Sequence, residues 1–341
     1  MELFLVLTHV DETGTALTKA SLEAVTAGVE LSTKIGAKLA IGVLGNAAAL
    51  DAVAATGARL LAVEGEAFAQ ARYATDSSAA EALCRTAGAS IVLAPSSSRF
   101  SRVAAGVAHR LGGFIDTHIT ALGGEAADSS EIQATRWFYR QRIEAVVSRD
   151  SRPWFLLIDA GTQKPYAGEP AAAQVEKIAV EAPASRTTVA GVRAPEQGQQ
   201  TIRPDAKMLF VAGAGWTKKQ PDGQVHTAEA AELILGFLRQ ASASLGSSKS
   251  LVDQGGEGNS VLPFLTHMNQ IGQTGATPRH AKGLSTCCHG EEPHVVGWRF
   301  IGDRRAISLD PNCGWTRGKA DVVYIADAFA VMARVNELLR N

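Results

Sequence analysis

The first half of the chain alternates short apolar runs with segments whose apolar residues recur at helical spacing. Residues that favour strands, bounded by polar or glycine-containing turns, are concentrated at 3–10, 38–45, 58–65 and 90–98. The intervening segments carry an amphipathic period, which predicts helices at 17–36, 48–57, 78–88 and 101–113. Near-continuous apolar strands that alternate with helices indicate a parallel sheet covered on both faces.

The composition and the hydrophobic periodicity change in the middle of the chain. Residues 183–206 are rich in Pro, Gln, Gly and Thr and have no sustained period, which is typical of a linker. Alternation then resumes, with a strand expected at 207–216 and a long helix at 227–246, for which Thr227 is the expected N-cap and Gly246 the stop. Further short apolar runs lie at 250–253, 294–298, 304–310 and 321–327, and a last helix is expected at 328–339.

The pattern predicts an α/β protein with two domains. We expect an N-terminal parallel-sheet α/β domain over residues 1–182, a linker over 183–206, and a C-terminal doubly wound α/β domain over 207–341. In such sheets ligands bind beyond the carboxyl ends of the strands. The loops that follow the strands are therefore the first places to look for chemistry.

Composition narrows the function classes. The net charge of −1 argues against a dedicated nucleic-acid binder, which needs clustered Lys and Arg. No apolar run approaches the ~20 residues of a membrane helix, and the short run after Met1 has no basic flank, so we expect neither membrane insertion nor a cleaved signal peptide. Four cysteines are too few for a disulfide scaffold and favour a reduced, cytoplasmic compartment.

Four small-residue loops follow predicted strands in the second half. Backbone N–H groups in such loops can converge on an anion, and glycine allows close approach because it has no Cβ. The loops are AGAGW (212–216), QGGEG (254–258), QIGQTG (270–275) and GLSTCCHG (283–290). Neither GxxxxGK[ST] nor GxGxxG is present. A nucleotide site across the strand ends and plain turns both remain open on the loops alone.

Several of these loops resemble one family in sequence order. QIGQTG (270–275) resembles the flavin loop of electron transfer flavoprotein alpha subunits. GSSKSLVD (246–253), GLS (283–285), AISLDPNCG (306–314) and ADVVYIADAF (320–329) resemble other motifs of that family. Segments 90–113 and 138–147 are similar to its N-terminal half more loosely. The chain is identified as a divergent member.

The resemblance implies an electron carrier rather than an enzyme with its own substrate. Alpha subunits of this family pair with a beta subunit, hold FAD in the C-terminal domain, and carry electrons from a flavin dehydrogenase to a quinone oxidoreductase or similar acceptor. Ser248 and Lys249 would approach the flavin ring, and Ser285 would reach phosphate. The remaining cofactor-binding positions that the resemblance implies are Gln270, Ile271, Gly272, Gln273, Thr274, Gly275, Thr286, His289, Ser308 and Asp327.

The chain departs from the family pattern at functional positions. Lys249 stands where the family has an Arg over the flavin; Lys is a flexible point charge, whereas Arg is a planar fork. Thr286 to Gly290 replaces a Gly-Ala-x-Gln-His stretch, and Ser308 replaces an Asn. An extra stretch at about 254–267 lengthens one loop. These departures leave open a nucleotide (AMP/FAD)-binding structural subunit without redox function.

Other side chains allow competing interpretations. Cys287 or Cys288 could be the nucleophile of a cysteine-dependent enzyme. A metal site is a separate alternative, but two adjacent cysteines with His289 cannot easily bind one tetrahedral ion together. We expect His280 on the surface, and Asp327 is also suited to cap the last helix. A basic-aromatic cluster is interpreted as a subunit interface rather than a nucleic-acid surface; it consists of Arg136, Trp137, Phe138, Tyr139, Arg140 and Arg142.

Overall fold

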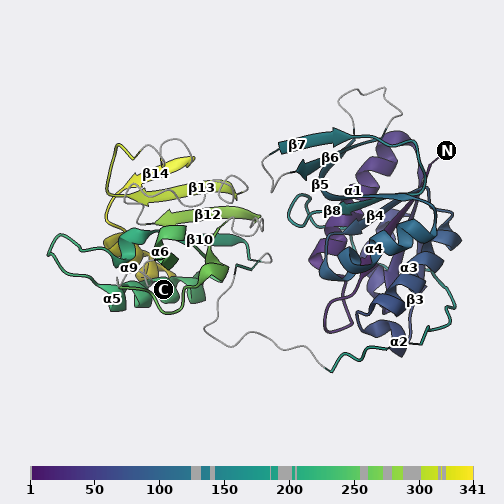
Figure 1. The fold of residues 1–341 in the computed structure, drawn as a ribbon, viewed down its shortest axis with the longest axis horizontal. Helices are drawn as coiled ribbons and strands as arrows, with labels where there is room; N and C mark the ends of the chain where they lie inside the picture. Colours follow the sequence, from purple (N-terminus) through teal and green to yellow (C-terminus); the bar gives the residue numbers. More distant parts are fainter. Residues whose placement is uncertain are drawn as a thin grey trace. The chain divides into compact units, whose positions relative to one another are not determined.

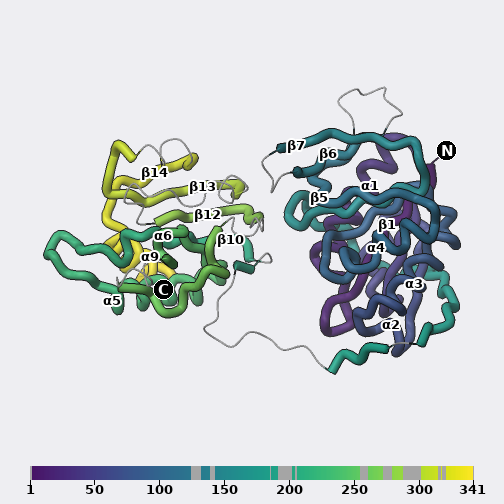
Figure 2. The backbone as a smooth tube through the Cα atoms, in the orientation of Figure 1, coloured from purple at the N-terminus to yellow at the C-terminus, as the bar shows by residue number. Residues whose placement is uncertain are grey.

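The computed structural model divides the chain into two compact units, Met1–Val192 and Arg193–Asn341 (Figures 1 and 2). The boundary falls inside the 183–206 segment. The described residues are 2–123, 132–138, 143–184, 186–190, 202–203, 206–253, 260–271, 279–286, 301–313, 316 and 320–340.

The first unit is built on a nine-stranded sheet in the described residues, with the order β7-β6-β5-β8-β4-β1-β2-β3-β9. Its pairs are parallel except β5–β6 and β6–β7, which are antiparallel. The strands are β1 (Leu3–His9), β2 (Lys38–Leu44), β3 (Arg59–Val63), β4 (Ile91–Pro95), β5 (Phe114–Gly123), β6 (Gln133–Phe138), β7 (Ile143–Val147), β8 (Trp154–Ile158) and β9 (Val175–Lys177).

Helices cover both faces of this sheet and separate two apolar clusters. One face packs against α1 (Lys19–Ile35) and η1 (Ala47–Thr56). The other packs against α2 (Glu66–Ala69), α3 (Tyr73–Ala87) and α4 (Ser98–Arg110). The α1 ends follow from sequence, since the Thr18 side chain accepts from Ser21 N and Gly36 takes the left-handed conformation at the C-cap.

The second unit is built on a parallel five-stranded sheet in the described residues, with the order β11-β10-β12-β13-β14. Its strands are β10 (Met208–Ala212), β11 (Ser244–Ser247), β12 (His280–Thr286), β13 (Ile301–Ser308) and β14 (Val322–Ile325). Its helices are η2 (Ala214–Thr217), α5 (Thr227–Ala241), α6 (Lys249–Asp253), η4 (His267–Asn269) and α9 (Ala328–Arg340). The long helices α5 and α9 pack together on one face around Phe210 and Trp216.

The expected α/β class is confirmed in both units, but three local expectations are wrong. Helix α5 ends at Ala241, with Ser242 left-handed, and Gly246 lies inside strand β11 instead of stopping the helix. Thr227 is the first helical residue rather than the N-cap, which is His226. The run 250–253 belongs to helix α6. Pairing of Leu245 with Phe210 in the sheet outweighs the helical period over 242–246.

The run 294–298 lies outside the described residues. No helix in the described parts of the chain combines the length and apolar character that a bilayer crossing requires.

Candidate functional site

The second sheet has a reversal of strand order at its centre. The chain leaves β10 toward β11 on one side, then returns to place β12 on the other side of β10. Ala212, the last residue of β10, pairs with Ser247 and with Thr286, so the carboxyl ends of these three strands are level. Loops that diverge at such a point leave a crevice, which is where open α/β sheets bind ligands.

Two serines at the end of β11 are fully buried. Among the described residues, neither the Ser247 hydroxyl nor the Ser248 hydroxyl has a hydrogen-bond partner. The Ser248 main chain is fixed, because its N–H donates to Ala212 O at 2.9 Å. A buried hydroxyl without a partner carries a desolvation cost, so this position suits a ligand that supplies a partner.

The first part of the QIGQTG motif lies directly against this strand end. Gln270 forms a parallel bridge with Ser247, and Ile271 N donates to Ser247 O at 3.2 Å. Ile271 is fully buried against Gly246, where an added Cβ would come within 3.1 Å of the Ile271 side chain. The structure therefore places Gln270 and Ile271 against Ser247, the residue that precedes Ser248, while Gly272, Gln273, Thr274 and Gly275 lie outside the described residues.

Thr286 ends the neighbouring strand β12, and its hydroxyl is already engaged. It donates to Val211 O at 3.1 Å and accepts from Trp216 Nε1 at 2.8 Å. The Trp216 ring packs 4.6 Å from the ring of Phe329 on α9. Thr286 thus fixes the loop after β10, and Ser285 beside it is also fully buried. His289 falls outside the described residues.

The predicted site residues Ser308 and Asp327 lie at the same edge of the sheet, further from β10. Ser308 ends β13, is buried, and exchanges 3.3 Å hydrogen bonds with the backbone of Asp310. Asp327 follows β14 and caps α9, since its Oδ1 accepts from Phe329 N at 3.0 Å. Both residues therefore have local structural roles in addition to their place at the carboxyl edge of the sheet.

Lys249 is placed differently from the serines. Its side chain is 65% exposed, and its Nζ lies 3.8 Å from Asp253 Oδ2 one turn along α6. An exposed pair of this kind contributes little to holding the ammonium in place. The charge is thus next to the site in sequence but is not held in one geometry.

Two residues next to the candidate site were not among the site residues predicted from the sequence, although both belong to segments that the sequence pattern singled out. Trp216 ends AGAGW, and Ser247 lies in GSSKSLVD. Ser247 could have been recognised from its pairing with Ala212 at the end of β10. That pairing depends on the strand register, which the sequence alone does not give.

The alternative roles considered for the histidines and cysteines can be compared with the structure only in part. His280 is buried and its Nε2 lies 2.8 Å from Arg203 O, so the expectation of a surface histidine is wrong. His280 begins β12, where it pairs with Ile301 of β13, and this place in the sheet accounts for its burial. No group of metal-ligating side chains occurs among the described residues, and Cys313 is buried. Cys287 and Cys288 lie outside the described residues.

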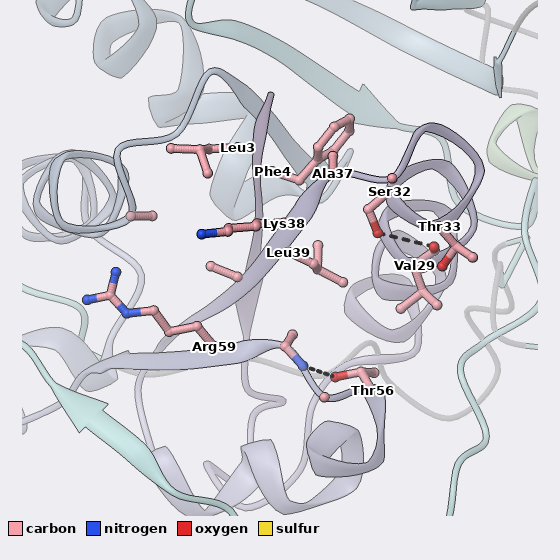
Figure 3. A pocket seen from close by; sticks show the side chains of 15 residues that line it. Leu3, Phe4, Val29, Ser32, Thr33, Ala37, Lys38, Leu39, Thr56 and Arg59 are labelled. Atoms are coloured by element: carbon pink, nitrogen blue, oxygen red, sulfur yellow. Dashed lines mark hydrogen bonds between the residues drawn. The ribbon is translucent and has the colours of Figure 1, made fainter. Parts of the chain in front are cut away.

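A separate pocket of about 810 Å³ lies in the first unit, at the amino-terminal ends of β1, β2 and β3 (Figure 3). The left-handed C-caps Gly36 and Gly57 border it, and Lys38 and Arg59 extend to the same side. Arg59 is engaged by Glu176 and Thr86 O. This is the sheet edge opposite to the one where α/β sheets bind ligands, and it contains none of the predicted site residues.

The two units are thus α/β domains, the second with buried polar side chains at the reversal point of its sheet. The model of the electron transfer flavoprotein domain matches residues 6–185, which is more than half of the 341 residues. The chain belongs to the electron transfer flavoprotein family. A search of curated proteins finds no match to the chain.

Proposed function

We propose that this chain is the alpha-type subunit of a heterodimeric electron transfer flavoprotein that binds FAD in its second unit. It would carry electrons from a flavin dehydrogenase to a quinone oxidoreductase or similar acceptor. The observation that carries the proposal is the buried Ser248 hydroxyl, which has no hydrogen-bond partner among the described residues and follows Ser247, the residue bridged by Gln270, at the reversal point of the second sheet. Membership of the family supports the electron-transfer role.

The residues at this edge fit a dinucleotide. Ser248 would donate to an acceptor on the cofactor, and the Gln270–Ile271 segment would line its side. Ser285, Thr286 and Ser308 extend the polar edge toward β13. When bound, the isoalloxazine ring supplies the electron transfer, and the chain contributes binding, orientation and exclusion of water. Gly272 to Gly275 and His289 belong to this proposal through the resemblance alone.

A nucleotide-binding subunit without redox function is the second candidate. The position of Lys249 favours it, because an exposed lysine paired with Asp253 offers little fixed charge for tuning a flavin. Under this alternative, the same buried edge would hold AMP, and the assembled protein would be colourless. Cofactor extraction from the assembled pair separates the two candidates.

We propose that the beta-type subunit contacts one face of the β6–β7 hairpin, here called the β6–β7 surface (Arg136, Phe138 and Ile143). Phe138 pairs with Ile143 across the strands, and Ile143 is 52% exposed. The Arg136 guanidinium lies 4.3 Å from the Phe138 ring centroid. Exposed apolar side chains supported by a stacked Arg, here on β6 beside the edge strand β7, are typical of interfaces.

An anchor below this surface holds its arginine. Arg136 Nη1 and Trp154 Nε1 donate to the buried carboxylate of Asp116 at 2.7 and 2.9 Å, and Arg149 also donates to it. Burial alone would raise the pKa of Asp116, but hydrogen bonds from Arg149 and Trp154 and the nearby arginine charge hold that pKa below its ordinary value. The Arg136 side chain is thereby held against Phe138 before a partner arrives.

The experiment that tests the FAD proposal uses the full chain co-expressed with its beta-type subunit. FAD affinity of the native pair is compared with that of Ser248→Ala and of Ser260→Ala, an exposed serine of the same unit. Weaker binding in Ser248→Ala alone supports the proposed site. Equal affinity in all three proteins would remove Ser248 from the site.

A further inference from the structure

The first sheet has its own reversal of strand order, between β1 and β4. The chain runs from β1 through β2 to β3 on one side, and β4 then lies on the other side of β1. His9 ends β1, and Ser97 follows β4 at the start of α4. Although 88 positions separate them, His9 Nε2 lies 2.9 Å from Ser97 Oγ. A histidine and a serine therefore meet where α/β sheets bind ligands.

The second ring nitrogen fixes the direction of this hydrogen bond. His9 Nδ1 lies 2.9 Å from Val10 O, and a carbonyl oxygen only accepts, so Nδ1 carries the proton of the neutral ring. Nε2 then presents its lone pair, and the Ser97 hydroxyl donates to it. Burial, with help from the charge of Arg99, lowers the pKa of His9 despite the opposing effects of Val10 O and Asp76. The imidazole is accordingly a neutral base at pH 7.

Both groups are held in place by the fold. His9 N donates to Ser21 Oγ at 3.1 Å, and Thr18 N donates to His9 O at 3.2 Å. The His9 ring packs 5.5 Å from the ring of Phe100. Ser97 lies in a strand–turn–helix connection as the N-cap of α4, where its Oγ accepts from Phe100 N at 3.4 Å. The pair is preorganised, with nucleophile and base within hydrogen-bond reach.

We propose that Ser97 is a nucleophile with His9 as its general base, and that the first unit transfers acyl groups from small esters. Ser97 Oγ attacks the ester carbonyl while its proton moves to His9 Nε2, and the alcohol leaves with that proton. Water then attacks the acyl-serine, with His9 again accepting and returning a proton, to release the acid and free Ser97. The N–H groups of Ser98 and Arg99, which precede the capped Phe100 N in α4, have no acceptor within the helix and are the donors available to the oxyanion.

Capping and nucleophilic roles use different features of the same hydroxyl. The cap needs only an acceptor lone pair, which an Asn side chain also supplies, whereas attack needs the hydroxyl itself. Ser97→Asn therefore keeps the helix cap and removes the nucleophile. Ser98→Ala, which changes the exposed neighbouring serine, is the matched control.

The test treats the full chain with a fluorophosphonate probe and follows adduct formation by intact mass and peptide mapping, with p-nitrophenyl acetate as an ester substrate. We expect one adduct on Ser97 in the native chain and in Ser98→Ala, none in Ser97→Asn, and labelling slowed about 100-fold in His9→Gln. Labelling should also fall as the pH drops through the lowered pKa of His9, whose charged neighbours are Arg99 and Asp76, because imidazolium cannot accept the proton.

Labelling of Ser97 no faster than in the urea-unfolded native chain would overturn the proposal, and so would an unchanged rate in His9→Gln. The unfolded comparison needs no variant, so the proposal stays testable even if a substitution prevents folding. The inference concerns the first unit and does not rest on FAD binding.

Discussion

At the residue scale, the most informative observation is that Ser248 is buried without a hydrogen-bond partner among the described residues. A side chain that destabilises the cofactor-free chain yet stands in a family motif is typical of a binding position. The Ser247 hydroxyl is likewise buried without a partner among the described residues, but Ser247 is part of the sheet, where it pairs with Ala212. The sequence could point to Ser248 through its motif, whereas recognising the orphaned hydroxyl requires the packing.

The first prediction concerns the opposite signs of two effects at Ser248. Ser248→Ala removes a buried hydroxyl with no partner, so we expect the cofactor-free chain to become more stable by about 1 kcal/mol. The same change removes a donor to the cofactor, so FAD should bind about 3- to 10-fold more weakly in the assembled pair. Urea unfolding of the chain and FAD titration of the pair measure the two effects.

Ser260→Ala is the control and should alter neither quantity. A Ser248→Ala chain that is less stable and binds FAD normally would show that the hydroxyl has a structural role instead.

The second prediction concerns Asp116. Asp116→Asn leaves Arg136 and Arg149 without their counter-charge, and we expect a loss of roughly 2–3 kcal/mol in the free energy of unfolding, less than for a fully buried pair because Arg149 is 36% exposed. Because the folded pKa is depressed, the native advantage is fully present above the unfolded pKa of about 3.9 and is lost as the pH falls through the lower folded pKa.

Urea unfolding of both proteins from pH 7 down to pH 3 checks this sign. A difference between them that grows as the pH falls would contradict it.

At the element scale, strands with continuous apolar character and helices with clear caps were the predictable part. β1, β2, β3 and β4 follow their runs, and Gly36 and Gly57 end helices as expected. The hairpin of β6 and β7 was not predicted, because QATRWF and IEAVV carry no clean alternation. β8 (WFLLI) had a clear apolar signal that could have been used.

The third prediction concerns the β6–β7 surface. Ile143→Asp places a charge on an exposed apolar position, so we expect association with the beta-type subunit to weaken at least 10-fold with little change in folding. Leu338→Asp, at an exposed apolar position on α9, is the control. Titration calorimetry or co-purification yield measures the effect. Equal association of native chain and Ile143→Asp would place the partner elsewhere.

At the scale of the whole molecule, the family match and the motifs that resemble flavin-binding segments lie in different units. The family match covers residues 6–185 in the first unit, whereas the motifs that resemble flavin-binding segments lie in the second. Alternation along the chain was enough to predict two α/β domains. The candidate site was predictable only as a set of loops, since the level ends of β10, β11 and β12 depend on pairing between distant segments.

The fourth prediction concerns the proposed domain bounds. The two apolar clusters of the first unit draw only on residues before 182. We therefore expect the fragment 1–182 to fold alone, because a domain with its own apolar core can do so, and to unfold in a single cooperative transition. Circular dichroism during urea unfolding measures it. A broad, non-cooperative transition would show that the first unit needs the rest of the chain.

The most direct measurement is the visible absorbance and extracted cofactor of the full chain purified together with its beta-type subunit. The proposed function predicts a yellow complex with flavin bands at about 375 and 450 nm and FAD released on denaturation. A colourless complex that takes up no FAD when it is supplied, or that releases only AMP, would contradict the claim that this chain carries electrons on a flavin.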